Sequence, residues 1–264
     1  MVASAFFVDI DFFLYYIGVM NEQIKELKRI VDESSNIVFF GGAGVSTESK
    51  IPDFRSDQGL YKKKYRYPAE VMLSHSFYEQ NVEEFFEFYW NQMIYLDALP
   101  NEAHKVLAKW EQEGKLKAIV TQNIDGLHQL AGSKNVFELH GSVLRNVCTG
   151  CHSRYTLQEA MSYCDDSNVP ICPCCHKVIK PDVVLYEEGL DESTLYGAIA
   201  AIERADCLIV GGTSLVVYPA AGLLQYFRGK YLVLINRDAT SMDGRADLVI
   251  HDSIGKVLKE VELL

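Results

Sequence analysis

Four of the seven cysteines have the spacing of a metal site. They form two short pairs, Cys148-x-x-Cys151 and Cys172-x-x-Cys175, separated by residues 152–171. In a zinc ribbon each such pair wraps one side of a tetrahedral ion, so the spacing predicts a Zn²⁺ site. Four thiolates fill the coordination sphere and leave no position for water or substrate, which makes the predicted zinc structural.

The other three cysteines fit this pattern less well. A Cys-x-Cys register between Cys172 and Cys174 is an alternative, and Cys164 is a less suitable spare. Cys207 lies in an apolar run and is interpreted as a core residue. Two disulfides, or four unpaired buried thiols, are the alternatives to a metal site. Zinc thiolates and leftover free thiols indicate a reducing compartment, so we expect a cytoplasmic protein.

A glycine-rich turn follows the apolar run at 36–42, in the stretch "FFGGAGVSTESKIPDFR". It resembles a dinucleotide-binding turn, but Thr47 stands where a third glycine would fall. The helix expected next is cut off by residues 51–55, Ile-Pro-Asp-Phe-Arg. The turn therefore predicts a phosphate site at a helix start, covered by a Pro-Asp-Phe-Arg hook rather than continued as an ordinary dehydrogenase fingerprint.

Two other apolar runs also end in polar residues. Gly211-Gly212-Thr213-Ser214 closes the run at 207–214, and Asn236-Arg237 closes the run at 230–236. In a doubly wound sheet the carboxyl ends of such strands meet at one crevice, where ligands bind. Three polar strand ends together predict a nucleotide site there.

The chain alternates apolar runs with helical segments, which predicts an α/β fold with a doubly wound, Rossmann-like parallel sheet. The expected helices lie at 191–205, 218–229 and 253–264. The expected strands lie at 36–42, 116–123, 135–141, 181–186, 207–214, 230–236 and 246–250.

Two stretches depart from the alternation and predict a smaller inserted domain. Residues 57–114 read as a helical module, and residues 143–180 as a zinc-binding module. The large domain would then comprise the three remaining ranges, 20–56, 115–142 and 181–264.

The apolar residues 1–19 lack the basic residues of a signal peptide. Met20 is therefore interpreted as the natural start and residues 1–19 as an extension outside the fold. A membrane-facing segment is the alternative.

The charge of the chain argues against nucleic-acid binding. Its 264 residues carry a net charge of -11, whereas affinity for nucleic acid comes from neutralising phosphates with Lys and Arg. The polar segment 152–168 of the zinc module is not basic either, which argues against a zinc-ribbon nucleic-acid module. Such an acidic surface suits basic partners such as lysine-rich peptides.

Five motifs occur in a fixed order: "GAGVSTESKIPDFRS", "TQNIDGLHQLAG", "FELHGS", the two cysteine pairs and "GGTSLVVYPAAGL". Together they closely resemble the sirtuins of bacterial type, NAD-dependent protein-lysine deacylases, from about Met20 to the C-terminus. The resemblance implies a Rossmann domain with a smaller domain built from a helical and a zinc module. It also implies NAD as a co-substrate, one structural Zn²⁺, acetyl-lysine proteins or peptides as partners, and no membrane.

The resemblance further implies the roles of individual residues. His140 would be the general base. Two other residues have simpler alternatives: Asp125 could be only a helix N-cap, and Phe54 only a core residue. The pyrophosphate would lie on the glycine turn, and the nicotinamide carboxamide on Ile124 and Asp125. The implied NAD-binding residues are Ala43, Gly44, Ser46, Thr47, Phe54, Arg55, Gln122, Asn123, Ile124, Asp125, Gly212, Thr213, Ser214, Asn236 and Arg237.

In the implied reaction NAD is cleaved rather than reduced. The acyl oxygen of the modified lysine attacks C1′ of the ribose as nicotinamide leaves, and His140 then accepts a ribose-hydroxyl proton. Water releases free lysine and O-acyl-ADP-ribose, so the enzyme is formally a transferase. A protein mono-ADP-ribosyltransferase that uses the same NAD site is the alternative function.

The acyl-lysine peptide is expected to enter as an extra strand between two segments of the chain. Sirtuins that prefer acidic acyl groups carry Tyr-x-x-Arg on the small-domain helix, but here Gln92 follows Tyr89, which predicts a preference for acetyl or apolar acyl groups. Two departures from the family pattern are Lys50 and Glu187, each in place of a glycine. The expected substrate-binding residues are Val184, Leu185, Tyr186, Val216, Val217 and Tyr218. We also expect the protein to be a monomer.

Overall fold

The computed structural model describes residues 10–56, 59–62 and 64–264. Among these residues, six strands form a parallel sheet in the order β3-β2-β1-β7-β8-β9. The strand order reverses between β1 and β7, so the ends of these two strands flank the crevice of a doubly wound sheet. The strands are β1 (Ile37–Gly41), β2 (Leu116–Thr121), β3 (Val136–Glu138), β7 (Cys207–Gly211), β8 (Tyr231–Ile235) and β9 (Leu248–Ile250).

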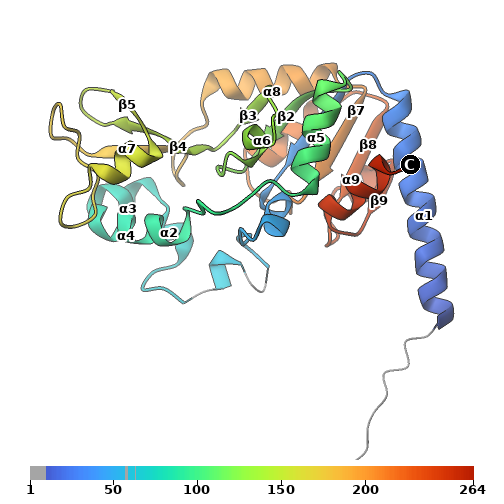
Figure 1. Cartoon of the computed structure of the whole chain (residues 1–264), viewed down its shortest axis with the longest axis horizontal. Helices are drawn as coiled ribbons and strands as arrows, with labels where there is room; N and C mark the ends of the chain where they lie inside the picture. The colour runs from blue at the N-terminus through green and yellow to red at the C-terminus, as the bar shows by residue number, and fades with distance from the viewer. Residues whose placement is uncertain (1–9, 57–58, 63) are drawn as a thin grey trace, which may run out of the picture.

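Helices cover both faces of this sheet because its strands are apolar on both sides. In β1, Ile37 and Phe39 pack toward one face, whereas Val38 and Phe40 pack toward the other. The first face is covered by α1 (Ile10–Glu33), α5 (Glu102–Gln112) and α9 (Ile254–Glu262). The second face is covered by α8 (Glu192–Arg204), which runs along the top of the view in Figure 1, and by the 3₁₀ helix η4 (Ala220–Tyr226).

The smaller domain lies at the left of Figure 1 and combines a three-stranded antiparallel sheet with short helices. Its sheet has the order β5-β4-β6, and its helical part is packed around a cluster of aromatic rings that includes Phe85, Phe86 and Tyr89. Val143 of β4 and Val183 of β6 join the same cluster, so the helical and zinc modules share one core. The elements are α2 (Ala69–Met72), α3 (His75–Gln80), α4 (Val82–Gln92), β4 (Gly141–Cys148), β5 (Arg154–Thr156), α7 (Leu157–Ser162) and β6 (Ile179–Val183).

Short helices line the connections between the larger elements. The glycine turn after β1 continues into two 3₁₀ turns, and a four-residue helix follows β2. These elements are η1 (Ala43–Val45), η2 (Thr47–Ser49), η3 (Leu60–Lys62), α6 (Leu127–Leu130) and η5 (Asp243–Arg245). None of the described helices is both long and apolar enough to span a membrane.

The strand expected at 181–186 was placed in the wrong sheet. It forms as β6, Ile179–Val183, and pairs antiparallel with β4 instead of joining the parallel sheet. Its apolar character reflects packing against the aromatic cluster of the small domain. Pro181 within the run was the available signal, because a proline in a strand favours an edge position.

Three helices also differ from the sequence-based expectation. Helix α5 lies within the range predicted for the small domain, yet Ala103, Val106, Leu107 and Trp110 pack on the parallel sheet. The segment at 218–229 forms the 3₁₀ helix η4 rather than an α-helix. Helix α1 begins at Ile10 rather than at Met20, and the expectation for residues 1–9 lies outside the described residues.

Candidate functional site

The two glycine turns that follow β1 and β7 pack directly against each other. The N–H of Gly44 donates a hydrogen bond to the carbonyl of Gly212 over 2.8 Å. Gly212 has a φ of +59°, and a Cβ added at Gly44 would lie 2.7 Å from the Cα of Gly212. Only glycine allows this approach, so the sequence motif has a steric reason independent of any ligand.

A cavity of about 770 Å³ opens at this point, between the two domains. It is lined by all the predicted NAD-binding residues, by His140 and by five of the six predicted substrate residues. The exception is Val216, which is not part of the lining and is 56% exposed. The sequence therefore identified a set of residues that the fold brings together from seven segments of the chain, around a space large enough for a nucleotide.

Ser46 lies at the centre of a chain of hydrogen bonds in the wall of this cavity. The amide of Asn123 donates to the Ser46 hydroxyl over 3.0 Å, and that hydroxyl donates to Oδ2 of Asp125 over 2.6 Å. The other carboxylate oxygen of Asp125 accepts the N–H of Leu127 at the start of α6. The N-cap residue of this helix is Gly126, so the interpretation of Asp125 as the N-cap is wrong; Asp125 lies one position earlier, accepts the first N–H of the helix and belongs to the cavity wall.

Burial raises the pKa of the Asp125 carboxyl, while the hydrogen bonds from Ser46 and Leu127 lower it in part. A second bond joins the ends of β2 and β7, since the side-chain amide of Gln122 donates to the hydroxyl of Thr213 over 3.1 Å. These bonds hold together polar side chains that follow β1, β2 and β7.

His140 is oriented by its own main-chain surroundings. Its Nδ1 lies 3.0 Å from the carbonyl oxygen of Gln122, which can only accept, so Nδ1 carries the proton. Nε2 is then the basic nitrogen. Burial lowers the pKa of the imidazole, and the bond to Gln122 opposes this shift in part. The lowered pKa keeps the ring neutral at neutral pH. Gly141 follows at a φ of +74°, and a Cβ there would lie 2.0 Å from the carbonyl oxygen of Asp182.

The Pro-Asp-Phe-Arg hook folds beside the glycine turn and lines the cavity. The Asp53 carboxylate accepts the N–H groups of Arg55 and Ser56, which closes the turn. The ring of Tyr61 packs against Phe54 at 5.5 Å between centroids and lies 5.2 Å from the Arg55 guanidinium. The sequence did not single out Tyr61. Residues 60–67, "LYKKKYRY", contain three tyrosines, and no motif distinguishes one of them from the others.

The segment of residues 184–188 forms one wall of the cavity and is bonded to the small domain. The N–H of Tyr186 donates to Leu73, and the N–H of His75 donates to the carbonyl of Tyr186. The N–H of Val184 donates to the carbonyl of His140. Among the described residues, the carbonyl of Val184 and the N–H of Glu187 have no main-chain partner, so both can pair with an added strand.

Three residues of the segment 214–218 on the large domain also line the cavity, namely Ser214, Val217 and Tyr218. Tyr218 is 76% exposed. The start of α9 also contributes Asp252, Ser253 and Ile254 to the lining. These three residues were missed, although the strand-end argument that identified Asn236 applies equally to the end of β9.

The four paired cysteines form a separate cluster at the far end of the small domain. Their sulfur atoms all lie within 4.8 Å of one another, and Cys148 and Cys172 are buried. Each of the seven cysteines, all in the described part of the chain, is a free thiol, which excludes the disulfide alternative. Cys174 is exposed and outside the cluster, so the Cys-x-Cys register is not used.

This thiol cluster fits a structural zinc ion. The main-chain N–H groups of Gly150 and Cys151 point at the sulfur of Cys148, at 3.3 and 3.5 Å. Such donors stabilise a thiolate, and four sulfur ligands with no open position are the donor set of a structural Zn²⁺.

Comparison with known proteins gives a consistent result. Residues 42–219 match the model of the Sir2 family. A protein of Clostridium acetobutylicum named NAD-dependent protein deacetylase is 63% identical over 242 residues, which cover 91% of this chain and 98% of that protein. A protein of the same name from Cutibacterium acnes is 52% identical over 240 residues, covering 90% of this chain and 97% of its own length.

Solved structures agree with the sequence relatives. A Sir2 protein with a p53 peptide and NAD⁺ superposes with a TM-score of 0.82 at 38% identity, covering 91% of this chain and 97% of its own. A Sir2 variant with the deacetylated p53 peptide and 3′-O-acetyl-ADP-ribose gives a TM-score of 0.84, also at 38% identity and with the same coverage.

Proposed function

Because the chain belongs to the Sir2 family and is an NAD-dependent protein deacetylase, we propose that its cavity joins NAD to an acetyl-lysine peptide with His140 as the general base. The observation that carries this proposal is the bond from His140 Nδ1 to the Gln122 carbonyl, which leaves Nε2 as the basic nitrogen in a cavity lined by the predicted NAD residues. The large domain would hold NAD, and the peptide would lie between the two domains.

The glycine turn would hold the pyrophosphate of NAD. Ala43 and Gly44 present main-chain groups at the carboxyl end of β1, where phosphate binds in folds of this kind. Arg55 supplies a cation from the hook. The residues at the ends of β7 and β8 would bind the adenosine half, and those after β2 the nicotinamide and its ribose; the first group is Gly212, Thr213, Ser214, Asn236 and Arg237, and the second Gln122, Asn123, Ile124 and Asp125.

The acetyl oxygen would form a bond to C1′ of the nicotinamide ribose, while the bond from C1′ to nicotinamide breaks and its electron pair leaves with nicotinamide. His140 would then take a proton from a ribose hydroxyl, whose oxygen attacks the imidate carbon. Addition of water and departure of the lysine amine give free lysine and O-acetyl-ADP-ribose. Phe54 would shield the reactive carbon from water at the first of these steps.

The acetylated peptide would add as a strand between residues 184–188 and residues 214–218. The unpaired carbonyl of Val184 and N–H of Glu187 support this mode of binding. A solved Sir2 relative, 37% identical, is described as bound to acetylated peptide. We therefore propose acetyl-lysine peptides as partners of this chain.

The acyl group accepted at this site would be uncharged. Tyr89 is fully buried, its hydroxyl has no partner among the described residues, and the neighbouring Gln92 accepts a hydrogen bond from Tyr65. Neither side chain supplies the positive charge that a succinyl carboxylate would need. An acyl series on one peptide tests this, with acetyl expected to be turned over faster than succinyl.

The proposal is tested by incubating the protein with NAD and an acetyl-lysine peptide. Free lysine peptide and nicotinamide should appear one for one, and His140→Ala should abolish both products while NAD binding and zinc content stay unchanged. Retained turnover would remove His140 from its role. Nicotinamide release that exceeds deacetylation, with ADP-ribose attached to protein, would favour the mono-ADP-ribosyltransferase alternative.

The chain is further proposed to act as a monomer in a reducing cytoplasm. The free thiols of all seven cysteines support the second part of this proposal. Light scattering at working concentration tests the first part.

A further inference from the structure

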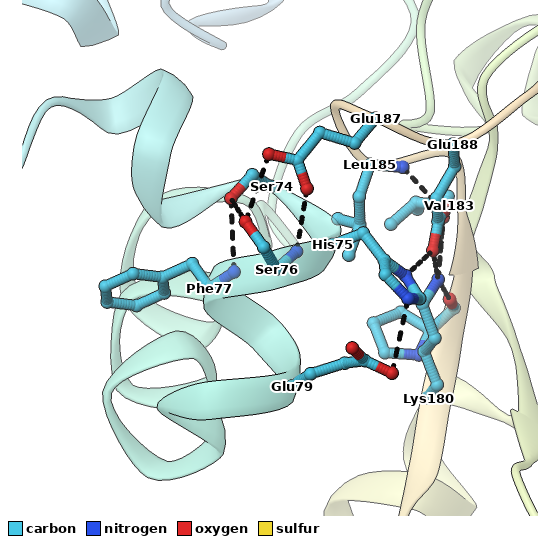
Figure 2. A network of polar contacts seen from close by, with 11 residues as sticks. Ser74, His75, Ser76, Phe77, Glu79, Lys180, Val183, Leu185, Glu187 and Glu188 are labelled. Carbon is cyan, nitrogen blue, oxygen red and sulfur yellow. Dashed lines mark hydrogen bonds and ion pairs between the residues drawn. The ribbon is translucent and has the colours of Figure 1, made fainter.

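The segment of residues 184–188 is attached to helix α3 by two neighbouring carboxylates (Figure 2). The Glu188 carboxylate accepts the N–H of Leu185 over 2.8 Å and contacts His75 Nδ1 at 2.8 Å. It also pairs with Lys180 at 3.2 Å. Glu188 therefore closes the turn of its own segment and ties it to the small domain.

Glu187 makes a separate attachment, on the side of the segment opposite to Glu188 in Figure 2. Its Oε2 accepts the N–H of Ser76 over 2.9 Å, and its Oε1 accepts the Ser76 hydroxyl over 3.0 Å. Ser76 lies in the first turn of α3, where main-chain N–H groups lack partners within the helix. The carboxylate thus supplies two acceptors to one residue.

The backbone of Glu187 makes this attachment unusual. Its φ is +76°, a left-handed conformation that a residue with a side chain rarely adopts without compensation. The two bonds to Ser76 provide that compensation. They also occupy both oxygens of the carboxylate, while Glu187 itself is exposed and lines the cavity.

We propose that Glu187 and Ser76 form a latch that holds residues 184–188 ready to pair with the acetylated peptide. Glu187 is in this view a positioning residue. With the latch closed, the free enzyme has already ordered its side of the peptide site, and binding costs less conformational entropy. The inference rests on the proposed function, because it requires that the peptide pairs with this segment.

Steady-state kinetics with an acetyl-lysine peptide at saturating NAD test the latch. Glu187→Gly should raise the KM for peptide about three- to tenfold, the loss expected for one charge-assisted pair of surface hydrogen bonds. The kcat and the KM for NAD should not change, because the bound peptide orders the segment. Glu187→Gln keeps the length and one acceptor oxygen and should restore most of the affinity. Glu83→Gln, an exposed acid without a partner among the described residues, is the matched control.

Two further measurements separate the latch from a merely structural role. Amide exchange of residues 184–188 in the free enzyme should be faster in Glu187→Gly and should return to the wild-type rate when peptide is bound. Ser76→Ala should raise the KM for peptide by less than Glu187→Gly, and adding it to Glu187→Gly should have no further effect. An unchanged KM for peptide in Glu187→Gly, or additive effects of the two variants, would overturn the latch.

The peptide itself distinguishes positioning from charge recognition. Peptides with lysine or glutamate beside the acetyl-lysine should keep the same ratio of kcat/KM in wild type and Glu187→Gln. A ratio that collapses in the variant would show that Glu187 reads the charge of the peptide. Val184→Asp tests the proposed peptide site separately from the latch. An unchanged KM for peptide in Val184→Asp would contradict the peptide site. A raised KM for peptide in Val184→Asp, together with an unchanged one in Glu187→Gly, would contradict only the latch.

Discussion

The hydroxyl groups of Tyr61 and Tyr186 share a hydrogen bond that joins the hook beside the glycine turn to the proposed peptide-binding wall. Tyr61 packs on Phe54 and Arg55, and the main chain of Tyr186 is paired with residues 73 and 75. The hook and the wall are therefore connected through one pair of side chains.

Removing this connection should weaken the binding of NAD. Tyr61→Phe keeps the ring contacts and loses only the hydroxyl bond, so we expect the KM for NAD to rise about two- to tenfold, the equivalent of one hydrogen bond. Steady-state kinetics at saturating peptide measure the effect. Tyr196→Phe, at an exposed position on α8, is the control. An unchanged KM for NAD in Tyr61→Phe would show that the hook holds its position without Tyr186.

The pKa of His140 sets the acid limit of catalysis. Burial lowers this pKa from its ordinary value of 6.5, and only the neutral ring can accept a proton. Activity should therefore be complete at neutral pH and fall as the pH drops through a value below 6.5. The pH profile of kcat/KM measures that midpoint, with intrinsic fluorescence to exclude acid unfolding. A midpoint above 6.5 would contradict the assigned environment.

Lys50 should cost stability because its φ of +65° lies in the left-handed region. Lys50→Gly relieves this conformation, and we expect unfolding to require about 0.5–1 kcal/mol more free energy. Lys105→Gly, within helix α5, should have the opposite effect by about 1 kcal/mol. Urea denaturation compares the two variants. Destabilisation by Lys50→Gly would mean that the lysine side chain makes a compensating contact.

Two adjacent buried histidines should make the fold sensitive to acid. His104 and His128 lie with ring centroids 4.7 Å apart, and both are at most 1% exposed. Burial lowers the pKa of His104 to about 4 and that of His128 well below 6.5. The unfolded chain therefore binds more protons between these values and pH 6.5, so stability is full above pH 6.5 and is lost as the pH falls below it.

His104 alone accounts for about 3 kcal/mol of this loss by pH 4 or lower. Replacing its partner, as His128→Phe, should make the free energy of unfolding depend less steeply on pH between 6.5 and 4. Urea denaturation at a series of pH values measures the slope. An equal slope in the variant and the wild type would show that His128 titrates normally in the folded state.

Removing zinc should unfold the zinc module and leave the parallel sheet intact. Cys148→Ser, or a strong chelator, removes the coordination that holds a module whose own core contains only four fully buried residues. Zinc content by mass spectrometry and amide exchange of residues 143–180 measure the loss. Cys174→Ser, exposed and outside the cluster, should retain one equivalent of zinc. Normal exchange in the zinc-free protein would mean that the metal is dispensable for this fold.

The motifs predicted NAD-binding residues that all line the cavity, but they did not predict Tyr61, residues 252–254 or the packing of the modules. The glycine turns and polar strand ends lie together because parallel strands place their carboxyl ends on one edge, a rule that sequence order alone satisfies. Strand β6 and helix α5 were misassigned because an apolar run shows that a segment is buried but not against which partner. Thus the residues of α5 show helical spacing regardless of the domain that they contact.

The two departures from the family pattern show a different limit. Lys50 and Glu187 both occupy positions with φ above +60°, so the sequence pattern of glycines did carry conformational information. What could not be predicted is the response of the chain at Glu187, where the side chain bonds to Ser76 on another segment. That contact depends on the placement of β6 beside α3, which the sequence did not indicate.

A single strand, β4, starts at the residue after His140 and ends at the zinc-cluster residue Cys148. Its eight residues span about 25 Å, so the metal is far too distant to influence the reacting sugar through its charge. The influence that remains is mechanical: one end of this strand is anchored by the ion, and the other fixes the direction of the imidazole. Scarcity of zinc in a cell would accordingly reach the reaction through the direction of the imidazole and not through charge at the sugar.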